Sequence, residues 1–182
     1  AVISQIEERT KAPGDRRPSI LEAPTMFQVA TLVGNLLRGV IERRLDGGME
    51  GEGPRFTASM IVAGQIRDME PRLFLVYPEG NFIEATPDTP FIQIGEHKYG
   101  KPLLDRVVTP KTSLDDGRKA VLLSMDSTLR SNLSVGMPLD LVMVRSDECK
   151  ICHQSRIEAD DPDFRAMSDG WSKALRDGFR AI

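Results

Sequence analysis

Apolar residues recur at intervals of three and four along several stretches of the chain, a spacing that places them on one side of a helix. The clearest stretch follows Thr25, which forms a capping box with Gln28 three positions later. It predicts a helix over 25–45 that ends before Gly47-Gly48. The same spacing predicts further helices over 1–9, from 96 or 97 to 107, over 112–129 and over 164–179.

Shorter apolar runs between turn residues predict strands. These runs cover 56–66, 72–77, 82–85, 91–94 and 138–144. Short strands with tight turns in the first three runs indicate an antiparallel meander, and 91–94 is a fourth short run. The intervening residues 10–24 and 46–55 are rich in Gly and Pro and are predicted to be loops. Strands grouped together with helices on either side indicate the α+β class.

Length and composition narrow the class of protein. The chain has 182 residues and a formal net charge of −3, which predicts one domain over 1–182 and disfavours a strongly basic nucleic-acid binder. No apolar run approaches the roughly 18 residues of a membrane span. Two cysteines do not make a disulfide scaffold. We therefore expect a cytoplasmic location, with neither nucleic acid nor membrane as a partner.

One short motif, Cys149-Lys-Ile-Cys152-His153, matches the attachment pattern of a c-type haem. A redox pair and half of a zinc site are the other interpretations, although a zinc site needs further ligands and His97 is the other histidine in the chain. So short a pattern also arises by chance, and we expect no cofactor and no metal here. The acidic stretch 158–163 lacks the spacing of a calcium loop and is interpreted as a loop and helix cap.

Two groups of polar residues are candidates for chemistry. Glu96 beside His97 is either an acid–base pair or a structural feature at a helix start. The second group surrounds the end of the helix predicted over 112–129 and consists of Asp126, Ser127, Thr128, Ser131 and Ser134. It is either a solvated polar cap or a hydrogen-bonding shell around an active site. A nucleophilic serine would need a base within reach, and spacing alone identifies none.

Four collinear stretches together match one known family. They are Ala63-Gly-Gln-Ile66, residues 71–90, Gln93-Ile-Gly-Glu-His-Lys-Tyr-Gly-Lys-Pro-Leu-Leu-Asp-Arg106 and Asp126-Ser-Thr-Leu-Arg-Ser-Asn-Leu-Ser-Val-Gly136. Through them, segment 58–144 resembles the C-terminal part of a proteasome-type β subunit of the bacterial Anbu family, which is related to the 20S proteasome and the HslV-type protease. Residues 1–45 fit the first two helices of that family, and 145–182 fit it less distinctively.

The resemblance implies a four-layer α-β-β-α sandwich of two antiparallel sheets, the fold of N-terminal nucleophile hydrolases. It also implies a threonine at the mature N-terminus, whose hydroxyl attacks a peptide carbonyl while its own amine acts as the base. A lysine and an aspartate tune this pair, and backbone amides stabilise the oxyanion. We expect the first strands and the nucleophile to lie before Ala1, since Thr10 and Thr25 are internal.

Three supporting residues carry over from the family. Residues 130–136 align with a loop in which an Asp and a Ser hydrogen-bond near the amine of the nucleophile. Ser134 matches the Ser, whereas Ser131 occupies the Asp position and weakens its electrostatic role. Glu96 stands where the family has the Ser of an Ile-Gly-Ser turn. A carboxylate there could accept a hydrogen bond from an ammonium, relay a proton or cap the following helix.

The leading interpretation is a subunit of a self-compartmentalised threonine peptidase acting on peptides or unfolded protein. We expect a homo-oligomer, either a ring or an open helical stack, with helices 25–45 and 96–108 as candidate contacts between subunits. A catalytically silent assembly subunit is the alternative, and haem or metal binding at Cys149, Cys152 and His153 is the third. Sequence leaves open the substrate specificity, the ring size and any regulatory ATPase.

Overall fold

The computed structural model describes residues 2–11, 19–46, 57–146 and 148–182. It divides into two compact units, residues 1–86 and 87–182, which are treated separately below. The prediction of a single domain over 1–182 stays a prediction. The loop predicted over 46–55 lies almost entirely outside the described residues.

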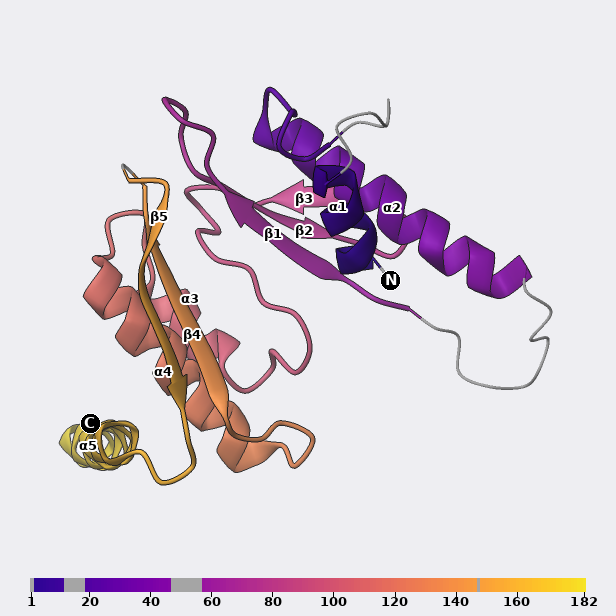
Figure 1. Ribbon diagram of the computed structural model, residues 1–182. Helices are drawn as coiled ribbons and strands as arrows, with labels where there is room; N and C mark the ends of the chain where they lie inside the picture. The colour runs from indigo at the N-terminus through magenta and orange to yellow at the C-terminus, as the bar shows by residue number, and fades with distance from the viewer. Residues whose placement is uncertain (1, 12–18, 47–56, 147) are drawn as a thin grey trace. The chain divides into compact units, whose positions relative to one another are not determined.

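Within its described residues, the first unit combines two helices with a three-stranded sheet (Figure 1). The elements are α1 (Val2–Lys11), α2 (Met26–Asp46), β1 (Met60–Gly64), β2 (Arg72–Val76) and β3 (Phe82–Glu84). The strands pair antiparallel in the order β1-β2-β3, which confirms the meander for these three. Both helices are confirmed, and the capping residue of α2 is in place because the backbone N–H of Gln28 donates to Thr25 Oγ1 at 3.2 Å.

The core of this unit lies between α2 and one face of the sheet. Val33 and Leu37 of α2 pack around Val76, and Ala30 packs against Phe74. The predicted apolar stripe of α2 is therefore the buried one. The helix also approaches the β2–β3 turn closely at Gly34. A Cβ added there would lie 2.2 Å from the carbonyl oxygen of Gly80, so this contact requires glycine.

In the part of the second unit that the structure describes, there are three helices and a β-hairpin (Figure 1). Its elements are α3 (Lys101–Val107), α4 (Leu114–Ser131), β4 (Leu139–Arg145), β5 (Lys150–Ile157) and α5 (Pro162–Ala181). Leu122 of α4 joins Leu139 and Ile157 of the antiparallel hairpin in one cluster, and Phe164 and Met167 of α5 pack against it. Asp161 caps α5 by accepting from the N–H of Phe164 at 2.8 Å, as the interpretation of the acidic stretch predicts.

Two local predictions are corrected by the structure, and one strand was missed. Residues 91–94 do not form a strand; Gln93 instead donates from Nε2 to Ser124 Oγ at 3.3 Å. The helix predicted from 96 or 97 begins at Lys101, because Gly95 adopts a φ of +76° and residues 98–100 form a turn. Strand β5 was not predicted.

The α+β prediction of two antiparallel sheets flanked by helices is confirmed. Each sheet buries one face against helices of its own unit. The opposite faces carry exposed aliphatic side chains, Ile61 and Ile83 in the first unit and Val142 and Val144 in the second. Among the described helices, none is long and apolar enough to cross a membrane.

Candidate functional site

A buried polar network ties the last turns of α4 to α5. Asp126 and Ser168 are each 6% exposed, and Ser168 Oγ donates to Asp126 Oδ1 at 2.7 Å. Arg130 completes the network, since its Nε lies 3.2 Å from both Asp126 carboxylate oxygens and its Nη2 donates to Ser168 Oγ at 2.6 Å. Both oxygens of the buried carboxylate are thus paired, as a buried charge requires. The network fixes the position from which the loop after α4 departs.

The hydroxyls within α4 are used internally. Ser127 Oγ donates to the Leu123 carbonyl at 3.0 Å, and Thr128 Oγ1 donates to the Ser124 carbonyl at 2.9 Å. These bonds to the preceding turn are an ordinary way for a helix to satisfy Ser and Thr. Ser127 and Thr128 therefore act as a structural polar cap, whereas the serines that follow them are placed differently.

Asn132 ends α4 and organises the loop that follows. Its backbone is extended, with φ −140° and ψ 115°, and its N–H donates to the Thr128 carbonyl at 2.9 Å. Its Oδ1 accepts two hydrogen bonds from Ser134, one from the backbone N–H at 2.8 Å and one from Oγ at 2.7 Å. Because a backbone N–H can only donate, the side-chain atom it meets is the amide oxygen. The Ser134 hydroxyl must then donate its hydrogen to that oxygen as well.

The predicted site residues fall at two places within the second unit. Ser131 and Ser134 are both exposed and lie together at the end of α4. Glu96 is exposed in the turn before α3. Gln93 and Gly100, on either side of that turn, contact Ser124 of α4. Ser124 lies about 10 Å along the helix axis from Ser131. No described residue forms a hydrogen bond or ion pair with the Glu96 side chain, and the structure does not join Glu96 to the two serines.

The pairing of Glu96 with His97 is likewise not formed among the described residues. His97 Nδ1 lies 3.1 Å from the carbonyl oxygen of Gly95, and its ring is exposed. This contact within the turn is the structural alternative that the sequence left open.

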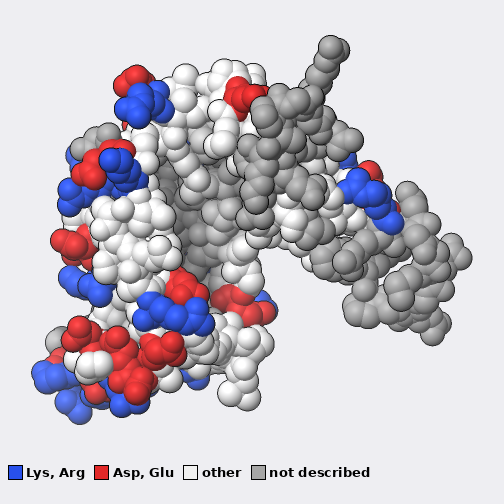
Figure 2. Space-filling model, viewed as in Figure 1, with Lys and Arg blue, Asp and Glu red and all other residues white. Residues whose placement is uncertain are grey.

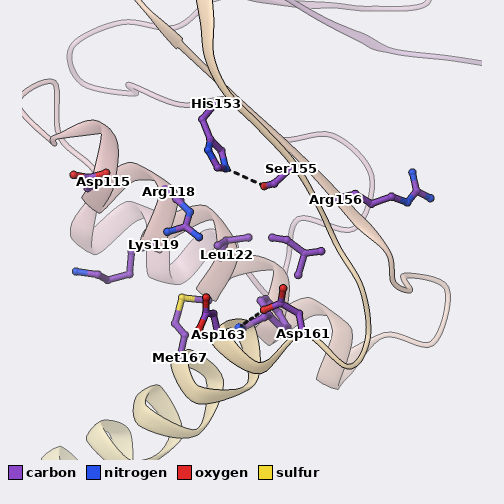
Figure 3. Close-up of a pocket in the computed structure, with 12 residues that line it drawn as sticks. Asp115, Arg118, Lys119, Leu122, His153, Ser155, Arg156, Asp161, Asp163 and Met167 are labelled. Atoms are coloured by element: carbon purple, nitrogen blue, oxygen red, sulfur yellow. Dashed lines mark hydrogen bonds between the residues drawn. The ribbon is translucent and has the colours of Figure 1, made fainter.

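A cleft of about 450 Å³ lies between α4, β5 and the start of α5 (Figure 3). Its apolar lining comes from the cluster of Leu122, Ile157, Phe164 and Met167. Its rim carries both signs of charge, as does the surface over α5, where Figure 2 shows acidic and basic side chains interspersed. A rim of mixed charge selects for neither an anion nor a cation.

The Cys-Lys-Ile-Cys-His stretch is distributed over the hairpin. Cys149 lies in the turn before β5 with a φ of +49°, and Cys152 lies at a β-bulge, where its Sγ donates to the Met143 carbonyl at 3.4 Å. His153 lines the cleft, with Nε2 3.0 Å from Ser155 Oγ (Figure 3). In the part of the chain that the structure describes, no three His, Cys, Asp or Glu side chains are grouped to hold a metal ion.

Sequence reasoning missed two residues of this region. Asn132 has a local signal, since an Asn two positions before a Ser is typical of an Asx turn after a helix. Ser168 has none, because its partners Asp126 and Arg130 are about 40 residues away in the chain.

Comparison with known proteins identifies the family. A family model described as proteasome subunit matches residues 45–144. A solved structure of Anbu from Hyphomicrobium sp. strain MC1 is 49% identical, with a TM-score of 0.89, covering 100% of this chain and 74% of that one. Anbu (ancestral beta-subunit) from Yersinia bercovieri is 42% identical, with a TM-score of 0.89 and the same coverages.

A third solved structure is the helical assembly of the Anbu complex from Pseudomonas aeruginosa. Its chain is 41% identical to this one, with a TM-score of 0.88, and 100% of this chain and 73% of that one are covered. A search of curated proteins returned no match. The structural matches confirm the proteasome-like α+β fold that the sequence predicted.

Proposed function

The chain belongs to the proteasome subunit family, on its Anbu branch, and from that premise we propose that it is a subunit of a homo-oligomeric, self-compartmentalised threonine peptidase. The observation that carries this proposal is the 49% identity to a solved Anbu chain over the whole of these 182 residues. The nucleophile is a threonine in a segment N-terminal to residue 1. Its amine takes the proton of its own hydroxyl as the oxygen attacks the peptide carbonyl.

Ser134 is the residue of this chain that we assign to the amine of the nucleophile. It occupies the family's Ser position and is exposed, so its oxygen is open to a further partner. Ser131 is the weaker contributor, because its hydroxyl lacks the charge of the family's aspartate. Glu96 has no described partner and is assigned only a long-range electrostatic influence on the ammonium form.

The test uses the full-length protein and a peptide vinyl sulfone, an electrophile that captures an N-terminal threonine. Intact mass and N-terminal sequencing identify the first residue of the mature protein, and a mass increase of one inhibitor is expected on that residue. Replacing that threonine by alanine is expected to abolish the adduct. A mature protein that begins with a residue other than Thr would refute the threonine peptidase.

A catalytically silent assembly subunit is the second candidate. The observation that favours it is the replacement of the family's charged Asp by an exposed Ser131. This candidate expects the same oligomer with no adduct at the N-terminal residue, so the same experiment distinguishes the two.

Assembly is the part of the proposal that both candidates share. The Pseudomonas aeruginosa relative is described as a helical assembly, which supports an open stack here as well. Sedimentation of the full-length protein at micromolar concentration is expected to give species many times larger than one subunit, and a monomer alone would contradict it. A cytoplasmic location and peptides or unfolded protein as substrates complete the proposal.

A further inference from the structure

We infer that Asn132 is a positioning residue, which holds the Ser134 hydroxyl as a pure acceptor for the amine of the nucleophile. This inference rests on the proposed function, and it adds a residue that the family alignment does not supply. Its basis is the pair of hydrogen bonds, 2.8 and 2.7 Å long, that converge on one oxygen of Asn132.

The orientation of the Ser134 hydrogen is determined by this geometry. The side-chain atom of Asn132 that accepts from the Ser134 N–H is the amide oxygen, which has no hydrogen to give. Ser134 Oγ therefore donates its single hydrogen to that oxygen and keeps two lone pairs. A charged or polar partner that approaches from solvent meets only these lone pairs.

Asn132 itself is held in place. Its N–H is bonded to the Thr128 carbonyl at 2.9 Å, and its own carbonyl accepts from the Val135 N–H at 3.3 Å. Two turns earlier in α4, the Asp126 carboxylate is anchored to Ser168 of α5. The amide oxygen is thus presented from a backbone fixed on both sides, as a positioning group requires.

The consequence concerns the lone pair of the amine. In the attack, the amine nitrogen accepts the threonine Oγ proton, Oγ bonds to the carbonyl carbon, and the carbonyl π electrons move onto its oxygen. A Ser134 hydroxyl free to rotate would donate to the amine nitrogen and occupy the lone pair that must receive this proton. Held by Asn132, it instead accepts an amine N–H and leaves that lone pair directed at the threonine hydroxyl.

The test measures inactivation of the full-length protein by the peptide vinyl sulfone, with the adduct quantified by intact mass. Asn132→Ala is expected to lower the maximum inactivation rate about tenfold, the worth of one well-placed hydrogen bond. The inhibitor concentration for half-maximal rate should not change, because a residue that only positions the Ser134 hydroxyl does not contribute to inhibitor binding. Leu133→Ala is the matched control, since that neighbouring side chain is fully exposed, and it should react like wild type.

Two further variants separate positioning from a general loss of structure. Asn132→Asp keeps an acceptor oxygen in the same place and should restore most of the rate. In a Ser134→Ala background, Asn132→Ala should cause no further decrease, because the group it positions is already gone. Equal losses for Leu133→Ala and Asn132→Ala, no rescue by Asn132→Asp, or additive losses in the double variant would each overturn the inference. If wild type itself forms no adduct, the proposed function fails instead, which keeps the two results distinct.

Discussion

The close approach of α2 to the β2–β3 turn makes Gly34→Ala the most discriminating test of the packing in the first unit. An alanine Cβ would lie 2.2 Å from the Gly80 carbonyl oxygen and 3.1 Å from its carbon. Ordinary contact begins at about 3.4 Å. The helix and the turn must therefore separate by roughly 1 Å, because the Cβ is fixed to the helix backbone, the group it meets is itself backbone, and neither can rotate away.

The expected loss of stability follows from two opposed effects. Overpacking typically costs about 1–3 kcal/mol, and a clash between backbones lies at the upper end of that range. Alanine is more favourable than glycine in a helix interior by roughly 1 kcal/mol, which offsets part of that cost. A net loss of about 2 kcal/mol corresponds to a Tm lower by roughly 4–8 °C for a protein of this size.

Gly39→Ala in the same helix is the matched control. Its Cβ would meet only the end of the Arg43 side chain, at 3.4 Å, so it should stabilise by about 0.5–1 kcal/mol. Urea denaturation followed by circular dichroism measures both variants against wild type. If Gly34→Ala were as stable as Gly39→Ala, the close contact with Gly80 would be refuted.

Three further outcomes are expected. The Arg72 guanidinium, which donates to both carboxylate oxygens of Glu84, lowers the pKa of Glu84. The ion pair therefore stabilises the fold at pH values above the unfolded-state pKa of Glu, about 4.3. Wild type should be more stable than Glu84→Gln by at most roughly 1 kcal/mol there, and this difference should disappear as the pH falls through the lowered pKa of Glu84. Free energies of unfolding that differ by the same amount from pH 7 to 3 would contradict this. Ser168→Ala removes the hydroxyl that donates to buried Asp126 and should cost about 1–3 kcal/mol in thermal unfolding, so a loss below about 0.5 would argue against the network. Cys152→Ser, at an exposed bulge, should leave stability and the visible absorption spectrum unchanged, whereas loss of a Soret band would restore the haem interpretation.

Helices with strong local signals could be predicted from the sequence. Thr25 and Asp161 cap α2 and α5 where the apolar periodicity begins, so capping and pattern agree. Strand β5 could not be predicted because 150–157 offers only two aliphatic residues, and the bulge at Cys152 breaks the alternation between them. Residues 91–94 were predicted to be a strand and are not one, because a short apolar run does not show whether a neighbouring strand is present to pair with it.

For the candidate site, the sequence predicted which residues are candidates but not the hydrogen bonds that hold them. Ser134 is a candidate by family resemblance and stays a prediction, whereas the direction of its hydrogen depends on the conformation of Asn132, which is set where α4 ends. The link from Asp126 to Ser168 joins two helices distant in sequence and has no periodicity to reveal it. Such contacts are products of tertiary packing, and pattern analysis along one chain does not reach them.

Helix α5 is anchored along only part of its length. Its first turns are capped by Asp161 and packed through Phe164 and Met167, whereas Leu175 and Phe179 are 53% and 83% exposed. In an isolated chain, the amide hydrogens of the first turns exchange with solvent only when the packed unit opens, and those near Phe179 exchange by local fraying. A protease would cut the same exposed turns first, and a neighbouring subunit seated on them would slow both processes together.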